Sequence, residues 1–300
     1  MQGLKYVSWG DTTGYAVAAK AYVRALATTG LPLTWAPMLA GRNLYEPYAS
    51  RDWPCPTLAS VCNRPIDHDT VLIHTVPEYY PEWIERERRP GRRILGYTVW
   101  ELERLPPHWP AILNQLDGVL LPCHWNVRVF RESGVTVPLH VVPHLSQFDG
   151  LDTLPADPGL DGRWRDRLLA AGARPDAFVF YAIGFWSNRK AMDRVLEAFL
   201  QAFDASDPVA LVLKTSRNDI TRWHRHWRNG FRLRHPSPAA TVAQRLRAHP
   251  NPPPCVVVTD EDLSDAEMLA LHRRGDCLVS LARTEGWGWG CSRPPGWAGR

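Results

Sequence analysis

The chain has 300 residues, of which 45% are hydrophobic and 22% are charged. At roughly 100–200 residues per domain, this length predicts two domains or one large one, and it excludes fibrous proteins and small disulfide scaffolds. The composition also excludes a disordered chain. The net charge of +4 is too small to indicate a polyanionic partner by itself. The six cysteines are scattered without zinc-type spacing, so we expect reduced, mostly structural thiols.

The chain has no pattern typical of a targeting or membrane-spanning segment. Residues 1–5 lead directly into a strand-like stretch, without the charged leader, apolar stretch and cleavage site of a signal peptide. The longest apolar run, residues 177–186, is about half the roughly 20 residues that a membrane-spanning helix needs. We therefore expect a cytoplasmic protein.

Short β-rich apolar runs alternate with longer stretches of helical period, which is the pattern of parallel sheets with crossover helices. In the first half of the chain, strands are expected at Leu4–Trp9, Leu33–Ala36, Thr70–His74, Ile94–Tyr97, Gly118–Leu121 and Leu139–Val142. Helices are expected there at Tyr15–Thr28, Pro107–Leu116 and Trp125–Ser133.

The same alternation recurs in the second half. Strands are expected at Phe178–Ile183, Ala210–Thr215, Cys255–Thr259 and Cys277–Leu281, and helices at Gly162–Ala171, Ala191–Phe203 and Asp265–Arg274. The stretch Pro143–Gly159 is rich in Pro, Asp and Gly and indicates a linker. The sequence therefore predicts an α/β fold of two Rossmann-like, doubly wound domains that face each other across a cleft. We place the first domain at residues 1–145, the linker at 146–160 and the second domain at 161–300.

Two loops that begin with glycine leave a strand and enter a helix, where backbone N–H groups and the helix N-terminus favour anions. Gly10–Gly14 is the first, and it lacks both the dinucleotide and the P-loop fingerprints, so an ordinary turn capped by Thr13 is an equal alternative. Gly184–Ala191 is the second, and it places Arg189 and Lys190 before an amphipathic helix. Cations there oppose the helix dipole, so a bound anion would explain them better than a solvated pair.

Two carboxylates follow expected strands. Glu285 lies on a glycine-rich turn, where a carboxylate can accept hydrogen bonds from sugar hydroxyls. A glutamate that caps a helix is the alternative. Glu101 follows the strand Ile94–Tyr97 and can orient an acceptor hydroxyl, or it can pair with Arg104.

Two basic stretches need a separate interpretation. Residues 222–234 interleave five arginines with Trp223, Trp227 and Phe231. We favour one apolar helix face packed on a core, with the arginines in water, over nucleic-acid stacking. A helix that binds a membrane surface is a third alternative. The run Arg86–Arg93 is expected to be a basic surface loop.

Six stretches of this chain occur in an ordered set that reaches to about residue 288. They are Gly14-Tyr15-Ala16, Gly96–Glu101, Leu121–Asn126, Val141–His144, Asn188–Lys190 and Thr284–Gly288. Together they resemble the family-4 (group 1) retaining glycosyltransferases of the GT-B fold. The resemblance implies a hexosyltransferase that uses a UDP- or GDP-linked sugar as donor and has no cofactor. It also implies a glycan, lipid or small-molecule acceptor and transfer with retention of configuration.

By this resemblance, Lys190 and Arg189 neutralise the donor diphosphate and Glu285 contacts the donor sugar, so these three would carry catalysis. The resemblance places five further residues at the donor site: Gly10, Gly14, Gly184, Gly286 and Trp287. Glu101 and Thr98 would lie on the acceptor side, where Tyr97 and Thr98 stand in the region of a histidine that many members have. No divalent metal is implied, because Arg189 and Lys190 can supply the positive charge.

The last residues depart from the family. Its second glutamate, which holds the donor ribose, is expected eight positions after Glu285, where this chain has Arg293. From about Cys291 the Arg, Pro, Gly and Trp content is typical of a shifted reading frame in GC-rich DNA. We therefore expect a glycosyltransferase that is truncated or frameshifted near residue 291, with an incomplete second domain.

Two other classes of protein stay open at this point. One is an inactive or non-catalytic remnant that binds a nucleotide or a membrane, which the missing glutamate and the basic stretch at 222–234 favour. The other is an NAD-dependent oxidoreductase on the same topology, against which the absence of Gly-x-Gly-x-x-Gly argues. We expect no nucleic-acid partner, and peripheral contact with the inner face of a membrane remains an option.

Overall fold

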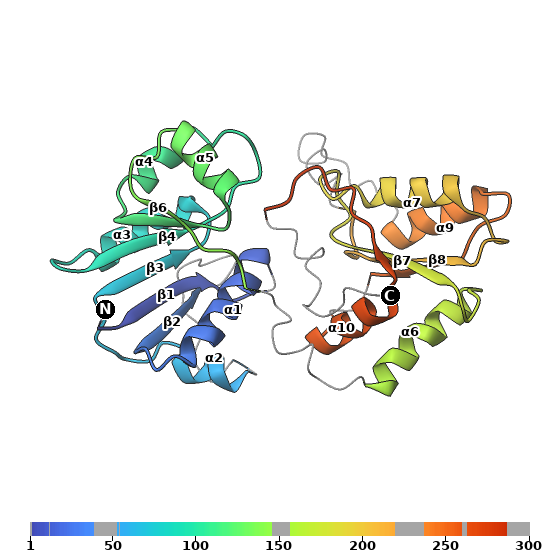
Figure 1. The fold of residues 1–300 in the computed structure, drawn as a ribbon, viewed down its shortest axis with the longest axis horizontal. Helices are drawn as coiled ribbons and strands as arrows, with labels where there is room; N and C mark the ends of the chain where they lie inside the picture. The colour runs from blue at the N-terminus through green and yellow to red at the C-terminus, as the bar shows by residue number, and fades with distance from the viewer. Residues whose placement is uncertain are drawn as a thin grey trace, which may run out of the picture. The chain divides into compact units, whose positions relative to one another are not determined.

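The structure is a computed structural model of the chain. It describes residues 2–11, 13–38, 53, 55–145, 157–219, 237–259 and 263–286. The chain divides into two compact units, Met1–Gln147 and Phe148–Arg300. Each unit is built on its own parallel sheet (Figure 1).

The first unit contains a six-stranded sheet. Its strands are β1 (Leu4–Trp9), β2 (Leu33–Met38), β3 (Thr70–His74), β4 (Arg93–Tyr97), β5 (Gly118–Leu121) and β6 (Leu139–Val141). They lie in the order β2-β1-β3-β4-β5-β6, and every neighbouring pair is parallel. A parallel sheet needs crossovers between its strands, and helices supply most of them here.

Helices cover both faces of this sheet. They are α1 (Gly14–Ala27), α2 (Pro56–Val61), the short 3-10 helix η2 (Pro77–Tyr79), α3 (Tyr80–Glu87), α4 (Trp109–Leu113) and α5 (His124–Glu132). Along β1, Tyr6 packs with α1 and α2, whereas Val7 packs with α3, α4 and α5. Because side chains alternate between the faces of a strand, one short apolar strand contributes to two cores.

The second unit contains a smaller, four-stranded parallel sheet. Its strands are β7 (Phe178–Ile183), β8 (Val209–Lys214), β9 (Cys255–Val258) and β10 (Cys277–Leu278), in the order β10-β7-β8-β9. Its helices are α6 (Pro158–Ala170), α7 (Met192–Ala202), α9 (Pro238–Ala248) and α10 (Asp265–Arg274). One core joins the sheet to α7 and α9, and the other joins it to α6 and α10 (Figure 1).

The expected strands are confirmed in position, with boundaries that move by one or two residues, except at the last strand. Sequence analysis extended that strand to Leu281, but only Cys277 and Leu278 pair with β7. Ser280 and Leu281 are exposed, so the expectation of a longer buried strand is wrong. The strand β10 therefore ends after two residues, and the loop 279–286 begins close to β7.

The expected linker is wrong at its end, because α6 begins at Pro158. Asp157 caps this helix by accepting the backbone N–H groups of Gly159 and Leu160, at 2.8 and 3.3 Å. A capping aspartate followed by proline at the first helical position is a helix start signal, and it was interpreted as linker composition. The helix α9 was missed although Ser237 and Pro238 form the same signal.

The helices α2 and α3 were also missed, and the basic loop expected at Arg86–Arg93 is wrong at both ends. Arg86 and Glu87 end α3, and Arg93 begins β4. Glu87 is 6% exposed, and its carboxylate contacts Lys5 of β1, His68 and Arg92. The distance to His68 Nε2 is 3.3 Å and the distance to Arg92 Nη1 is 2.8 Å. This carboxylate therefore joins α3 to β1 and to the segments before β3 and β4.

The charges around Glu87 make its contribution depend on pH. Burial raises the pKa of Glu87, but the hydrogen bonds and charges of Lys5, His68 and Arg92 outweigh burial and hold that pKa below its usual value. A lowered folded-state pKa means that the stabilisation is complete above the unfolded-state pKa. It is lost as the pH falls through the folded-state value.

Glu87→Gln is expected to lower the free energy of unfolding by roughly 1–3 kcal/mol at pH 7, because Lys5 and Arg92 lose their countercharge. Urea denaturation should show that this difference from wild type shrinks below about pH 4. Glu82→Gln, in the exposed Glu82–Arg86 pair of the same helix, is the matched control. It should change stability by less than about 1 kcal/mol. Equal effects of the two substitutions would contradict this account of Glu87.

Candidate functional site

The carboxyl ends of β10, β7 and β8 lie at one edge of the second sheet, because these neighbouring strands are parallel. The loop 184–191 follows β7, residues 215–219 follow β8, and residues 279–286 follow β10. Ligands of open α/β sheets bind at this edge. The two loops that sequence analysis selected in this unit are therefore neighbours in space.

The structure brings Lys190 and Glu285 into direct contact. Lys190 Nζ lies 2.6 Å from both Oε1 and Oε2 of Glu285. The lysine side chain is 18% exposed and the glutamate side chain 31% exposed, so the pair lies at the surface but is partly covered. Of the alternatives left open above, neither a solvated lysine nor a glutamate that caps a helix describes this contact.

Backbone contacts hold the same two loops together. Arg189 Nη1 donates to Thr284 O at 3.0 Å, and the backbone N–H of Arg283 donates to Arg189 O at 2.8 Å. The backbone N–H of Lys190 donates to Ser187 Oγ at 3.2 Å. Arg189, Lys190 and Glu285 therefore form one cluster, which we call the 190/285 cluster.

Gly184 lies beside the stem of Lys190. A Cβ added at Gly184 would make an ordinary van der Waals contact with Lys190 Cγ, at 3.4 Å. The Gly184 N–H donates to Lys214 O at 3.0 Å, which ties the start of the loop to β8. Gly286 directly follows Glu285 and is half-buried. Trp287, also expected at the donor site, lies outside the described residues.

Ala191 carries backbone strain next to the cluster. Its φ is 50° and its ψ is 38°, in the left-handed region, and it is the residue that caps α7. Left-handed backbone costs a residue with a Cβ roughly 1–2 kcal/mol, and such strain gathers at functional sites. The backbone N–H of Ala191 donates to Ser187 O at 2.8 Å, which fixes the turn that presents Lys190.

A buried hydroxyl lies at the same sheet edge. Thr215 follows β8 and is 4% exposed, and its Oγ1 has no hydrogen-bond partner within the described part of the chain. Next to it, Ser216 Oγ accepts the backbone N–H of Trp186 at 3.1 Å. Native proteins rarely leave such a group unsatisfied, so Thr215 is an unusual buried polar position at this edge of the sheet.

In the first unit, the loop that begins at Gly10 leads into α1 through the capping residue Thr13. Thr13 Oγ1 caps α1 by accepting the backbone N–H of Ala16, and Asp11 Oδ1 accepts the backbone N–H of Thr13 at 2.9 Å. A Cβ at Gly10 would lie 2.5 Å from the ring of Trp53, so close packing requires this glycine. Gly14 has open space where a Cβ would lie.

The two residues expected on the acceptor side differ in accessibility. Thr98 is fully buried, and its hydroxyl shares a hydrogen bond of 3.0 Å with the Tyr15 hydroxyl. Glu101 is half-buried on the loop that follows β4, and Asn126 of α5 holds that loop by donating to Trp100 O at 2.7 Å. Burial raises the pKa of Tyr15 to about 12, and the charge of Glu101 adds to this shift. Glu101, unlike Thr98, is placed to reach a ligand directly.

Sequence analysis missed a histidine cluster at the carboxyl edge of the first sheet. His74 ends β3 and is fully buried, its Nδ1 is 2.7 Å from the Tyr6 hydroxyl, and its ring is stacked with His144 at a centroid distance of 6.1 Å. His144 Nδ1 lies 3.0 Å from the Tyr97 hydroxyl. His74 could have been found from the sequence, because it is a polar residue at the end of an apolar strand. The same pattern identified Glu101 after the next strand.

Burial keeps both histidines neutral near neutral pH. It lowers the pKa of His144 to about 4, and it lowers the pKa of His74 well below its usual value, with the neighbouring His144 adding to that effect. His74 Nε2 has no hydrogen-bond partner among the residues that the structure describes. The cluster therefore adds a buried, neutral acceptor or donor beneath the loops of the first sheet.

Several expected features fall outside the described residues. These are the basic stretch 222–234 and the position of the second glutamate, Arg293. The acidic run 260–262 directly after β9, which sequence analysis passed over, is also outside them. Within the described residues, no group of three His, Cys, Asp or Glu side chains is arranged to hold a metal ion. No described helix has the length and apolar character that crossing a membrane requires.

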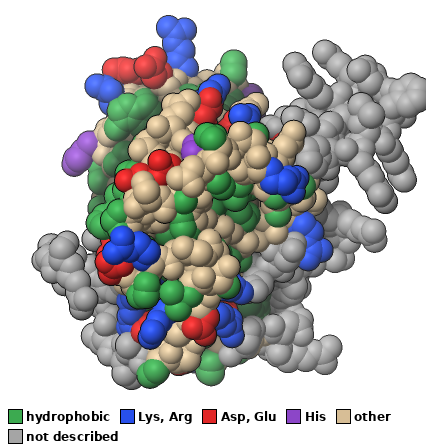
Figure 2. All heavy atoms as spheres, turned by 90° about the vertical axis from the view of Figure 1, so that its right-hand side faces the viewer, with side chains coloured by type: hydrophobic (Ala, Val, Ile, Leu, Met, Phe, Trp, Pro, Cys, Tyr) green, Lys and Arg blue, Asp and Glu red, His purple; other side chains and the backbone are tan. Residues whose placement is uncertain are grey.

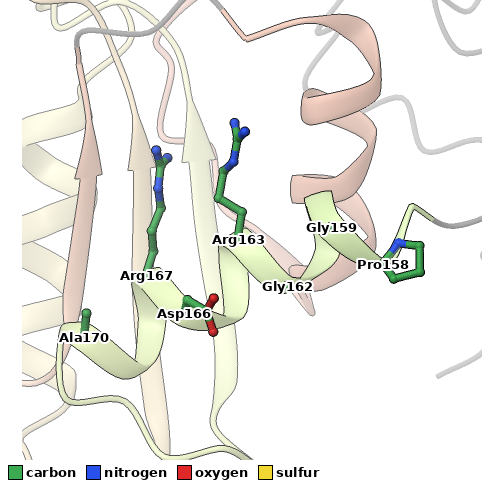
Figure 3. A pocket seen from close by; sticks show the side chains of 7 residues that line it. All are labelled: Pro158, Gly159, Gly162, Arg163, Asp166, Arg167 and Ala170. Atoms are coloured by element: carbon green, nitrogen blue, oxygen red, sulfur yellow. The ribbon is translucent and has the colours of Figure 1, made fainter.

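A surface groove of about 650 Å³ follows α6, where Arg163, Asp166 and Arg167 line it (Figure 3). Its lining includes no residue of the 190/285 cluster. Arg163 pairs with Glu267 of α10, and Arg167 lies over the ring of Trp164. Its cations are thus engaged within the protein. On the face of the second unit in Figure 2, described acidic and basic side chains are interspersed and form no large patch of one sign.

Comparisons with known proteins give structural matches only. No protein-family model and no curated protein matches the sequence. The E. coli trehalose-6-phosphate structure with bound UDP-2-fluoroglucose is 13% identical, covers 94% of this chain and 79% of its own, and has a TM-score of 0.58. HepE of Anabaena with UDP and glucose is 10% identical, with 94% and 74% covered and a TM-score of 0.58.

A third match is the α,α-trehalose-phosphate synthase (UDP-forming) of Burkholderia vietnamiensis, which is 12% identical, with 95% and 78% covered and a TM-score of 0.55. The fold is that of the GT-B glycosyltransferases. The α/β class expected from the sequence is thus confirmed, and the sheet of the second unit is the smaller one. At these identities the likeness concerns the fold.

His144→Gln is expected to remove part of the acid sensitivity of the first unit. A histidine whose folded-state pKa is about 4 loses stabilisation as the pH falls from its unfolded-state value of 6.5 toward 4. Between pH 7 and pH 5.5 the wild type should therefore lose about 1 kcal/mol more unfolding free energy than the variant does. Urea denaturation at the two pH values measures this, and parallel losses in both proteins would contradict it.

Ala191→Gly should keep or raise the free energy of unfolding, by up to about 1 kcal/mol, because glycine tolerates the left-handed backbone. Ala191→Val should lower it by at least about 1–2 kcal/mol. Ala182→Gly is the matched control, since Ala182 is equally buried but lies in β7 with an ordinary φ. Thermal or urea unfolding gives the three values. A loss at Ala191→Gly as large as at Ala182→Gly would show that position 191 is unstrained.

Proposed function

We propose that the protein is a glycosyltransferase that transfers a sugar from a UDP- or GDP-linked donor to an acceptor hydroxyl with retention of configuration. The observation that carries this proposal is the 190/285 cluster, in which two cations and a carboxylate lie together at the carboxyl edge of the second sheet. The GT-B fold supports it, and so do the solved structures of that fold that hold UDP or a UDP-sugar analogue. The ordered motifs support a relationship to family 4.

In this proposal, Lys190 and Arg189 bind the donor diphosphate. Charge builds on the diphosphate as the bond to the sugar breaks, and a fixed cation stabilises that charge more in a partly covered site than in water. Lys190 is held in place by its backbone hydrogen bond to Ser187 and by the strained turn at Ala191. Phe185, which lies where these enzymes often have an arginine, is 59% exposed and supplies no charge, so the neutralising falls to Lys190 and Arg189.

Glu285 contacts the donor sugar in this proposal, because a carboxylate can accept two or more hydrogen bonds from hydroxyls. Glu101 serves the acceptor, since it is half-buried at the carboxyl edge of the first sheet. Thr98 acts indirectly, by fixing the Tyr15 hydroxyl, which also donates to Val99 O at 3.0 Å and so holds the start of the Glu101 loop.

Nucleoside diphosphate binding tests the donor site directly. At one hundred times its Kd, a ligand of the folded state adds about 2.7 kcal/mol of stability, which raises the unfolding midpoint of a domain of this size by about 5–10 °C. We expect UDP or GDP to give such a shift, and NAD to give none.

Lys190→Ala should weaken that binding by at least about tenfold, because a hydrogen bond to a charged group contributes about 1.5–3 kcal/mol. Arg194→Ala is the matched control, since Arg194 is a cation of α7, the helix that follows Lys190, and is paired with Glu197 on the surface. Isothermal titration of both variants separates the two. Absence of any shift with UDP and GDP would remove the basis of the proposed function, and equal weakening in both variants would remove the special role of Lys190.

A further inference from the structure

The contact between Lys190 and Glu285 has the form of a bound anion. Lys190 Nζ reaches both carboxylate oxygens at the same distance, 2.6 Å. Two oxygens of one phosphoryl group offer a lysine the same arrangement. The carboxylate therefore takes up the position that the proposed function gives to the diphosphate.

The pair can separate without disturbing the loops that carry it. The loops are joined by Arg189 to Thr284 O and by the Arg283 N–H to Arg189 O, and neither contact involves the Glu285 side chain. The turn before α7 is closed by Ser187, through its hydroxyl and its carbonyl oxygen. Only rotation of two partly exposed side chains is needed to open the contact.

A diphosphate and the Glu285 carboxylate cannot share Lys190 at low cost, because two anions within a few ångströms repel each other. Arg189 and Arg283 lie on the same two loops, so the anion that replaces Glu285 still meets positive charge. Binding at this position is then an exchange of one anion for another.

We propose that Glu285 is a placeholder for the donor diphosphate, which must displace it from Lys190. This inference rests on the proposed function and adds an order of events to it. A nucleotide sugar offers the hydroxyls of its donor sugar to the displaced carboxylate, and a free nucleoside diphosphate lacks that sugar. Glu285 thus selects the donor over the spent nucleotide and, once the sugar has left, returns to Lys190 and expels the product.

Isothermal titration of the full-length chain with UDP, UDP-glucose and GDP tests this exchange. Glu285→Gln keeps the size of the side chain and removes its charge, so it should bind UDP, or GDP if GDP is the nucleotide that the chain prefers, at least about tenfold more tightly than wild type. UDP-glucose should gain less, so the preference for UDP-glucose over UDP falls. Glu285→Ser should behave in the same way, which guards against an effect of the glutamine itself.

Two controls isolate the pair. Glu197→Gln removes an equal charge from an exposed carboxylate of α7 that pairs with Arg194, and it should leave the affinities within twofold of wild type. In a Lys190→Ala background, Glu285→Gln should gain several-fold less than in wild type, because the two anions no longer compete for a cation and only their repulsion remains.

The outcomes separate the two proposals. If wild type binds UDP or GDP and Glu285→Gln binds it no more tightly, the placeholder role of Glu285 is wrong. The proposed function is then unaffected. A gain of undiminished size in the Lys190→Ala background overturns the placeholder as well, because it reflects net charge alone. If neither wild type nor Glu285→Gln binds UDP, UDP-glucose or GDP, both proposals fail. Binding that appears only in Glu285→Gln supports both.

Discussion

The parallel pairing of strands within each sheet determines where the loops of this protein lie. Every strand of both sheets runs in the same direction as its neighbours, so the chain must cross over after each strand and return to the same edge. Within each sheet, all carboxyl ends then lie at the same edge of that sheet, however far apart the strands are in the sequence. Lys190 and Glu285 are separated by 95 residues and are in contact for this reason. The 190/285 cluster follows from topology before any ligand is considered.

Electrostatics then determines what each edge can bind. Both loops selected as anion sites already hold a carboxylate of this chain, but in different ways. Asp11 accepts from the backbone N–H of Thr13 two residues away, so the helix start of α1 is closed by a local turn. Glu285 reaches Lys190 from a different strand end, through two side chains that can rotate. The first contact belongs to the secondary structure, and the second can be exchanged.

The parts of the fold that could be predicted are those that depend on local apolar runs. The strand Phe178–Ile183 is six residues of mostly apolar and aromatic type, and a short run of this kind is typical of a buried strand. The helices α6 and α9 were misjudged because Asp157-Pro158 and Ser237-Pro238 mark turns as well as helix starts. The contact of Lys190 with Glu285 and the burial of Thr98 and His74 depend on packing between distant segments. Residue type alone does not carry that information.

The strained turn at Ala191 fixes the position of Lys190. A residue holds a left-handed backbone only when its surroundings enforce it, and here the hydrogen bonds to Ser187 and to the Thr284 loop surround Ala191. The position of Lys190 is therefore set in advance, and a ligand does not have to order the loop when it binds. Preorganised charge of this kind stabilises a leaving group without reorganisation at the moment of reaction. An incoming anion must still displace the Glu285 carboxylate from Lys190. Its affinity therefore depends on how much more strongly it binds Lys190 than the carboxylate does.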